Sequence, residues 1–572
     1  MGISRGGELV EAEATRHSVR SKVFSCGVRR SPLDLALITL VCVLCYHNTF
    51  SNEFIRDDIG VIVENDAVTQ QLSLAEIFGT AYRGSTEDGL YRPLTVLTFA
   101  LNHRLSGLSP VSYHVVNLVL HVLNSILLYL FLRRLLSGGH GLIGALLFAA
   151  HPVHTEAVTS IVGRAELLAA FFTLSALYIH SLRPADGSRR LAGGLLLPGL
   201  YLLGIFSKEN VITLPLALVA LDFHLGRFKW ERTYFSRAYP ALLVTGLACF
   251  GVRWMVLGGF GPDASTQYFS GESPLTVLFT MSEVHFQYLR LLIFPVHLHV
   301  DETYRTLVGG FVSTLTLETL FNLVILVAMG SLTAILFLKR SSAGLFLALF
   351  YVLLLTVMNI IPIGALMAER FLYLPSMCFA AIVDLLVLRL LPSRRAVLGA
   401  LVAAVVCSYA LIGLQRNLDW RDGISMGEIV VRNNPAAPEP RFDLGTYYFS
   451  ASRFEESVEE FRAFNQLRPR DAKGYFALGH SLEKLGQTRR ARAYYLEAIA
   501  ADETFSDAYL NLGILHATEG DWRNAEGYLR KAIRHDPGNG LYHFNLGLLH
   551  EETGRADEAE REKQRARELG FG

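Results

Sequence analysis

Residues 472–505 read AKGYFALGHSLEKLGQTRRARAYYLEAIAADETF, and residues 506–539 read SDAYLNLGILHATEGDWRNAEGYLRKAIRHDPGN. The dipeptide Leu-Gly recurs every 34 residues, at 444–445, 478–479, 512–513 and 546–547. Small residues keep the same period (Ala491, Ala525, Ala559), and a glycine divides three of the units (Gly486, Gly520, Gly554). Small residues let two helices approach closely, so the pattern predicts a helix–turn–helix unit that stacks into an α-solenoid.

The length of the unit is that of a tetratricopeptide repeat. We expect a half-repeat at 417–437, because Asp419-Trp420-Arg421 lies three periods before Asp521-Trp522-Arg523. The full units then lie near 438–471, 472–505, 506–539 and 540–572. A solenoid of this kind presents a concave surface to a protein partner, which predicts binding of an extended peptide or a helix and names no reaction.

The remainder of the chain is far more apolar than the repeats. Of 572 residues, 51% are hydrophobic and 18% are charged, with a mean hydropathy of +0.33. By direct count, 48 of the 104 charged residues lie in the last 158 positions. We therefore expect a cytosolic tail at 1–30, a multi-pass membrane domain at 31–414 and a soluble domain at 415–572. Equal numbers of basic and acidic residues, 52 each, argue against a nucleic-acid partner.

The apolar runs predict about eleven membrane crossings, since a run of roughly 20 residues spans a bilayer. The runs are 33–46, 111–132, 142–159, 167–182, 191–206, 211–223, 239–257, 317–338, 345–367, 371–391 and 396–414. Basic residues then fall on the cytosolic side only if the segment 275–294 is re-entrant or interfacial, which places the repeats outside the cytosol. If 275–294 crosses, the repeats become cytosolic and two basic loops break the positive-inside rule.

The loop after the first apolar run carries the adjacent carboxylates Asp57 and Asp58. Acids at a membrane surface are costly to desolvate unless they are used or paired. Their functional interpretation is a general base, with the second acid orienting the base or the acceptor. The alternative is a solvated pair of loop acids that caps a short helix.

Further polar residues follow in loops assigned to the same membrane face. Two histidines and a glutamate at i, i+3 and i+5, His151, His154 and Glu156, could ligate a metal. Pro152 and the lack of a third ligand fixed by spacing favour contacts with a phosphate or a sugar instead. Each cation taken alone could equally be a snorkelling anchor or a salt bridge. The other candidates of this face are Arg92, Arg164, Glu166, Lys208, Glu209, Arg370 and Tyr373.

Five ordered motifs at these positions resemble one known family. They are RDDIGVIVEND (56–66), YRPLTVLTFALNHRLSGLSPVSYHVVNLVLHVLN (91–124), HPVHTEAVTSIVGRAELLAAFF (151–172), SKENVITLPLALVALD (207–222) and ERFLYLPS (369–376). Placed before tetratricopeptide repeats, they resemble the transmembrane and tetratricopeptide-repeat O-mannosyltransferases. The resemblance implies an all-α fold, with a GT-C glycosyltransferase domain in the endoplasmic reticulum membrane and luminal repeats. It also implies dolichyl-phosphate-mannose as donor and serine or threonine hydroxyls of cadherin-type secretory proteins as acceptors, through an inverting reaction.

The resemblance carries over residue by residue. Asp57 and Asp58 match the acidic pair of the family, one of which would take the proton of the acceptor hydroxyl. The other matched residues would bind the donor's phosphate or sugar: His151, His154, Glu156, Arg164, Glu166, Lys208, Glu209, Arg370 and Tyr373, with Arg92 added from the loop pattern. The expected partners are membrane lipid, the lipid-linked donor and an acceptor protein in the repeat groove, and no cofactor or metal is expected.

Two other classes of function compete with this interpretation. A non-catalytic membrane scaffold would use the repeats to recruit a protein partner and would not depend on Asp57 and Asp58. A transporter would place its charges near the bilayer midplane, with symmetry between two halves. The charges here gather at one face, which favours the enzyme.

Overall fold

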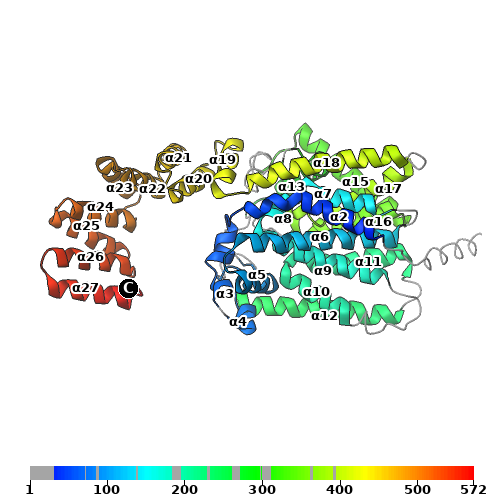
Figure 1. The fold of residues 1–572 in the computed structure, drawn as a ribbon, viewed down its shortest axis with the longest axis horizontal. Coiled ribbons are helices and arrows are strands. Elements are labelled where there is room, and N and C mark those ends of the chain that lie inside the picture. The colour runs from blue at the N-terminus through cyan, green and yellow to red at the C-terminus, as the bar shows by residue number, and fades with distance from the viewer. Residues whose placement is uncertain are drawn as a thin grey trace, which may run out of the picture. The chain divides into compact units, whose positions relative to one another are not determined.

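The computed structural model describes residues 31–70, 72–84, 89–136, 140–182, 195–227, 232–259, 269, 271–296, 298, 311–360, 365–390 and 395–571. The described residues form helices and no strand (Figure 1), so the all-α prediction is confirmed. The chain divides into two compact units, Met1–Asp422 and Gly423–Gly572. We call them the membrane unit and the solenoid. The expected cytosolic tail at 1–30 lies outside the described residues.

The membrane unit is built from long apolar helices joined by short irregular segments. Its α-helices are α2 (Pro32–Tyr46), α3 (Asp66–Thr69), α4 (Leu74–Gly79), α5 (Pro93–Ser106), α6 (Pro110–Leu135), α7 (Leu142–Ala150), α8 (Thr155–Thr159), α9 (Arg164–Ser181), α10 (Leu197–Ser207), α11 (Leu214–Leu225), α12 (Arg232–Leu257), α13 (Pro274–Ile293), α15 (Leu317–Leu338), α16 (Ser342–Leu354), α17 (Ser376–Leu390) and α18 (Arg395–Asp419). Short 3₁₀ or π turns are η1 (His47–Ser51), η2 (Ile59–Val63), η3 (Pro152–His154), η4 (Ile161–Gly163), η6 (Glu209–Thr213), η9 (Leu355–Val357) and η10 (Glu369–Leu372).

Six of these helices are long and apolar enough to cross a membrane. They are Pro32–Ser51, Pro110–Leu135, Ile161–Ser181, Ala238–Leu257, Leu317–Leu338 and Ala396–Asp419, and the shorter apolar helices Leu197–Ser207 and Ser342–Val357 accompany them. Large apolar side chains cover the outside of the unit, including Leu33 and Leu317, which are 80% and 87% exposed. Such a surface is stable in lipid and not in water, so the unit is a membrane domain.

The number of crossings stays a prediction, because several expected spans are short helices. The helix α13 over 274–293 forms at the segment interpreted as re-entrant, and it is not among the six candidates. The expected run at 142–159 is not one helix: α7 ends at Ala150, and η3 and α8 follow. Pro152 has no N–H to continue the helix, and His151 before it is extended (φ −64°, ψ 123°). The break brings irregular backbone into the core of the unit.

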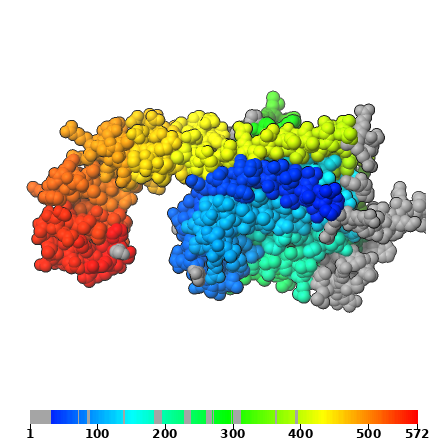
Figure 2. All heavy atoms as spheres, viewed as in Figure 1, coloured from blue at the N-terminus to red at the C-terminus, as the bar shows by residue number. Residues whose placement is uncertain are grey.

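The core of the membrane unit packs α2, α6, α7, α9, α16 and α17 together. The helices α6 and α9 contact each other extensively, and α2 lies against both α6 and α7. In Figure 2 the dark blue α2 lies on the visible face of the unit, where Leu40 and Leu44 are half-exposed. A second, smaller core forms under the first polar loop from Val61, Ile62, Tyr82, Val96 and Phe99.

The solenoid consists of one leading helix and four helix pairs. They are α19 (Gly423–Asn433), then α20 (Pro438–Ser450) with α21 (Phe454–Leu467), α22 (Ala472–Lys484) with α23 (Thr488–Ala501), α24 (Ser506–Thr518) with α25 (Trp522–His535), and α26 (Gly540–Glu552) with α27 (Ala556–Glu568). The first helices of the pairs begin 34 residues apart, at 438, 472, 506 and 540. The period of the sequence is therefore the period of the helix pairs.

The Leu-Gly positions explain why the two helices of a pair lie so close. A Cβ added at Gly479 would stand 2.8 Å from the ring of Tyr495, and at Gly513 it would stand 2.8 Å from Leu529. Ala491 and Ala525, which face them, are fully buried. Even a Cβ does not fit at these two glycines unless a neighbour shifts, so the Leu-Gly landmarks are packing requirements.

Candidate active site

The two adjacent carboxylates of the first polar loop have different surroundings. The Asp57 side chain is 54% exposed, and its Oδ1 accepts a hydrogen bond from Nη2 of Arg83 at 2.7 Å. Asp58 is 1% exposed. Its Oδ2 accepts the backbone N–H of Ile55 at 3.2 Å, and its Oδ1 accepts that of Val162 at 2.9 Å. Asp58 therefore ties the loop to η4, while Asp57 faces the outside.

The burial of Asp58 changes its acidity. Removal from water raises the pKa of this carboxyl to about 7, and the N–H donors of Val162 and Ile55 offset only part of that rise. Charge on Asp57 adds to the rise. Asp58 is thus poised to exchange a proton near neutral pH, whereas Asp57 is the carboxylate that a bound molecule can reach.

Three ion pairs lie where several helices of the membrane unit end. Arg92, just before α5, donates from Nε and Nη2 to both oxygens of Glu209, at 2.9 and 2.5 Å. Lys208, just after α10, pairs with Glu166 at the start of α9. The third pair joins Arg370 of η10 to Glu156 of α8, and the backbone N–H of Arg370 donates to the same carboxylate at 2.8 Å.

The three pairs form one group, which we call the ion-pair cluster (Arg92, Glu156, Glu166, Lys208, Glu209, Arg370). The charge of Lys208 interacts with Glu166, Arg92, Glu209 and Arg370. The ring of Phe371 lies under two of the cations, 5.5 Å from Nζ of Lys208 and 5.3 Å from Cζ of Arg370. The structure therefore brings together six of the residues singled out in the sequence, from segments more than 200 positions apart.

The cluster is buried at one end and open at the other. The side chains of Lys208 and Glu166 are 7% and 4% exposed, whereas those of Glu209 and Arg370 are 44% and 29% exposed. Burial would raise the pKa of Glu209, but the adjacent Arg92 lowers it to about 2. Glu209 is therefore ionised at neutral pH, and the open side presents fixed charges to an incoming polar molecule.

Tyr82 connects the acid loop to the ion-pair cluster. Its ring lies 5.0 Å from Cζ of Arg92. Its carbonyl accepts a hydrogen bond at 3.0 Å from Nδ2 of Asn65, a residue of the loop that carries Asp57 and Asp58. Neither Tyr82 nor Phe371 is among the site residues predicted from the sequence. An aromatic residue adjoining a functional arginine is the signal that could have identified Phe371.

Arg164 has a different environment from the other cations. It is fully buried, and its guanidinium donates to Oδ1 of Asn117 and of Asn102 at 3.0 Å and to the carbonyls of Tyr113 and Thr98. These acceptors are neutral and they belong to α5 and α6. Arg164 thus fastens α9 to those helices, and a role in donor binding stays a prediction from the family motif.

His151, His154 and Tyr373 form part of a buried polar chain in the core. Nε2 of His154 donates to Oγ of Ser376 at 2.7 Å, and Nε2 of His151 donates to the carbonyl of Leu292 at 3.1 Å. The Tyr373 hydroxyl contacts Nδ1 of His121 at 2.8 Å. Nε2 of each histidine contacts a different partner, and among the described residues the two histidines do not belong to a group of three side chains within metal-ligand distance of one another.

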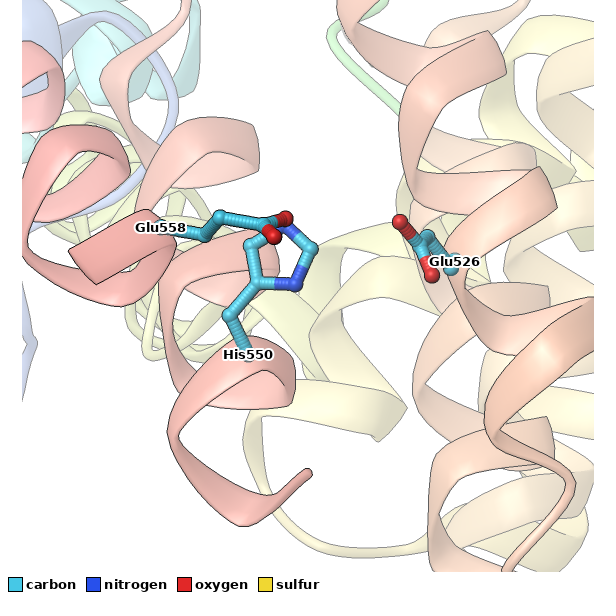
Figure 3. A group of neighbouring side chains, drawn as sticks. All are labelled: Glu526, His550 and Glu558. Carbon is cyan, nitrogen blue, oxygen red and sulfur yellow. The ribbon is translucent and has the colours of Figure 1, made fainter. Parts of the chain in front are cut away.

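The solenoid holds a separate group of acids around a histidine. One ligand atom each of Glu526 (α25), His550 (α26) and Glu558 (α27) lies within 4.8 Å of the others (Figure 3). Arg555 donates to both oxygens of Glu526, at 3.1 and 3.0 Å, and Arg530 pairs with the same carboxylate at 2.6 Å. Because arginines already neutralise Glu526, the group is best described as an ion-pair network between repeats.

A cavity of about 490 Å³ lies on another part of the membrane unit. It is lined by residues of α3, α4 and α5, among them Ile77, Leu97 and Arg104. None of the predicted site residues lines it. The cavity is therefore separate from the ion-pair cluster.

Comparison with protein families identifies two regions. Residues 92–255 match the family described as dolichyl-phosphate-mannose-protein mannosyltransferase. Residues 476–532 and 510–569 match the tetratricopeptide repeat. The first match contains five of the six members of the ion-pair cluster, and the sixth, Arg370, lies outside it. The predicted solenoid of tetratricopeptide repeats is confirmed.

The chain is also similar to curated proteins. The chain is 30% identical over 507 residues to protein O-mannosyl-transferase TMTC3 of Mus musculus, covering 81% of this chain and 54% of that protein. It is 28% identical to Tmtc3 of Drosophila melanogaster, covering 82% and 59%. Over a shorter stretch, 26% of this chain and 18% of the relative, it is 38% identical to TMTC1 of Homo sapiens. The chain spans a little over half the length of the first two relatives.

Among solved structures, that of MamA covers 27% of this chain at 25% identity with a TM-score of 0.25, too low to bear on the fold. The resemblance to transmembrane and tetratricopeptide-repeat O-mannosyltransferases, noted from the five sequence motifs, is confirmed by the curated relatives and the two family matches.

Proposed function

Because this chain resembles the protein O-mannosyl-transferases, we propose that it is a glycosyltransferase which moves mannose from dolichyl-phosphate-mannose to serine or threonine hydroxyls of secretory-pathway proteins. The observation that carries the proposal is the ion-pair cluster, together with the matched mannosyltransferase region around it. Buried ion pairs contribute little to stability once desolvation is counted. Their gathering beside a reachable carboxylate in a membrane domain fits a site for a charged lipid substrate.

The donor's phosphate would lie against the cationic side of the cluster. The leaving group of the reaction is a lipid phosphate, already a stable anion. Arg370 and Lys208 both lie close to the Phe371 ring and can donate to phosphate oxygens as charge develops on them. Such fixed cations can stabilise departure of the phosphate without a metal. The glutamates keep the cations in place before the substrate arrives.

The acceptor hydroxyl would meet Asp57. A general base must reach the proton that it removes, and the half-exposed Asp57 meets that condition better than the buried Asp58. We assign Asp57 as the base and Asp58 as the residue that positions its loop, through hydrogen bonds to Ile55 and Val162. Attack by the hydroxyl on the anomeric carbon, opposite the departing phosphate, would invert that carbon.

The solenoid would hold the acceptor protein. A protein-binding surface tethered to a catalytic domain raises the local concentration of the acceptor without adding a catalytic group. We place the membrane unit in the endoplasmic reticulum membrane and the solenoid in the lumen, in line with the basic residues of the loops. Cadherin-type extracellular domains are the acceptors that we test first.

Transfer by the wild-type protein tests this proposal. Membranes carrying the full chain or an empty vector would receive labelled dolichyl-phosphate-mannose, or labelled GDP-mannose after donor synthesis has been blocked, together with a folded cadherin-type domain. We expect labelled mannose on the acceptor only with the lipid-linked donor and only with the chain present. Equal labelling in the vector control would overturn the enzyme, and a bound protein partner of the solenoid would then point to a scaffold.

A further inference from the structure

Arg253 of α12 is a cation of the membrane unit to which the proposed function assigns no role. It lies four positions before the end of α12, inside the candidate span Ala238–Leu257. Its Nη2 donates to the carbonyl of Gly89, three residues before Arg92. Its Nη1 is buried and has no hydrogen-bond partner among the described residues. An arginine that only snorkels would turn its whole head group toward water, which this one does not do.

Arg253 belongs to the electrostatic surroundings of the ion-pair cluster. Its charge interacts with Glu209 and with Arg92, and its hydrogen bond to Gly89 holds it beside the segment that carries Arg92. In the part of the chain that the structure describes, no carboxylate lies within ion-pair distance of Arg253. The guanidinium is therefore fixed through Nη2, whereas its buried Nη1 has no hydrogen-bond partner among the described residues.

The charge balance of the site favours an anionic ligand for Nη1 of Arg253. The cluster contains three cations, and each is paired with one glutamate: Arg92 with Glu209, Lys208 with Glu166, and Arg370 with Glu156. Three positive and three negative charges sum to zero. A site with no net charge attracts a phosphate weakly, and Arg253 adds a positive charge that none of the three glutamates pairs with.

We propose that Arg253 binds the phosphate of the lipid-linked substrate through Nη1, and that it supplies the net positive charge of the donor site. The inference rests on the proposed function, since it assigns a residue to the donor site of that reaction. A guanidinium keeps its charge at every physiological pH and donates along a fixed direction, which suits a phosphate held in one orientation. Arg253 binds the intact donor and the released lipid phosphate, which carries more negative charge.

Binding of dolichyl phosphate to the purified full chain tests the proposal without relying on transfer. The wild type, Arg253→Gln, Arg253→Lys and the control Arg104→Gln would be placed in lipid nanodiscs. Arg104 is an exposed arginine on α5, at the separate cavity. We expect Arg253→Gln to weaken dolichyl phosphate binding roughly tenfold or more, since a charge-assisted hydrogen bond is lost. Arg253→Lys should bind with intermediate affinity, and Arg104→Gln should bind as the wild type does.

Two further ligands separate the sources of the effect. Dolichol, which lacks the phosphate, should bind equally to the wild type and to Arg253→Gln, because the arginine contacts the phosphate and not the lipid. Inorganic phosphate should compete with dolichyl phosphate only at far higher concentration, because it lacks the lipid. In transfer assays, Arg253→Gln should raise the KM for the donor more than it lowers kcat.

The outcomes distinguish the inference from the function beneath it. Equal affinity of the wild type and Arg253→Gln for dolichyl phosphate would overturn the role of Arg253 and leave the proposed function standing. No binding of dolichyl phosphate by the folded wild type would overturn both. If Arg253→Gln does not fold, Arg253→Met takes its place, since it also removes the charge. Binding of dolichyl phosphate by folded Arg253→Met with the affinity of the wild type would contradict the proposal.

Discussion

The membrane unit and the solenoid both carry ion pairs, but they hold them in opposite surroundings. In the membrane unit, Lys208 and Glu166 pair with side chains 7% and 4% exposed. In the solenoid, Arg468 and Glu439 pair at 2.6 Å with side chains 51% and 60% exposed. The repeats have no need of buried charge because a core of alanine, leucine and aromatic residues, such as Ala491 and Tyr495, already holds them together.

This difference in burial indicates which ion pairs have a function beyond stability. Exposed pairs cost little to form and contribute little, about 0–1 kcal/mol. Buried pairs lose the hydration of two ions, and their mutual attraction often does no more than offset that loss. The solenoid's pairs cost little to form and need no special function, whereas stability does not explain the buried pairs of the membrane unit. We propose that the charges of the membrane unit are retained because they bind the substrate.

The largest effect should come from Asp57, which has no counterpart in the solenoid. Removing a general base lowers the rate by about 10²–10⁴-fold, so Asp57→Asn should lose mannose transfer by that factor while folding normally. Asp66→Asn, which changes an exposed acid of the same loop, should transfer at the wild-type rate. Initial rates at matched protein levels measure both. Full activity of Asp57→Asn would remove the base from this loop.

The two kinds of ion pair should respond differently when one partner is removed. Lys208→Met leaves Glu166 buried and unpaired, which should cost about 3–5 kcal/mol of folding free energy. Arg468→Ala in the solenoid should cost no more than about 1 kcal/mol. The midpoints of thermal unfolding in detergent provide the comparison.

A double variant separates the effect of the buried pair on stability from its effect on transfer. Lys208→Met with Glu166→Leu replaces the buried pair by apolar groups, so stability should return toward the wild type while transfer does not. A double variant that recovered transfer as well would show that the pair is structural, and the contrast between the two regions would fail.

Packing, and not charge, should decide the stability of the solenoid. Gly479→Val places a Cβ 2.8 Å from Tyr495, and overpacking of this kind costs about 1–3 kcal/mol. Gly527→Ala in α25 meets nothing within 4 Å and should stabilise its helix by about 1 kcal/mol. Far-ultraviolet circular dichroism of the solenoid region during thermal unfolding checks both. Equal effects of the two substitutions would contradict the close-packing account of the Leu-Gly positions.

The smallest effect should be a difference in pH dependence at Asp58. Its pKa is about 7 in the folded chain and 3.8 in the ordinary state, so the folded protein holds a proton that the unfolded chain has released between these values. The contribution of Asp58 to stability is therefore greatest below pH 3.8 and falls as the pH rises to about 7. Asp58→Asn does not titrate. Relative to this variant, the wild-type melting temperature should fall between pH 5 and pH 8, and a constant difference would contradict the raised pKa.

The sequence predicts the solenoid better than it predicts the site. The Leu-Gly spacing is enough to identify helix pairs because each landmark answers to a contact within one repeat, such as Gly479 with Tyr495. In the membrane unit the motifs predicted a set of polar site residues but not which of them pair with one another. Lys208 and Glu166 are 42 positions apart, and no local pattern pairs them.

Other parts of the site depended on tertiary packing that periodicity does not reveal. Arg164 matches a family motif, yet its guanidinium donates hydrogen bonds to Asn117, Asn102 and two backbone carbonyls. Arg253 is not among the site residues predicted from the sequence, because it stands alone in an apolar run. A lone charge within a membrane helix is nevertheless itself a signal of function. The break of the predicted helix at 142–159 follows from Pro152, which local rules do foresee.

The most direct measurement is mannose transfer by the purified full chain and by its double variant Asp57→Asn with Asp58→Asn. Each would be supplied with labelled dolichyl-phosphate-mannose and a folded cadherin-type domain, and the labelled sites would be mapped by mass spectrometry. Our account predicts mannose on serine or threonine with the wild type and none above background with the variant. Equal transfer by the two proteins would contradict the claim that the polar face of the membrane unit is a mannosyltransferase site.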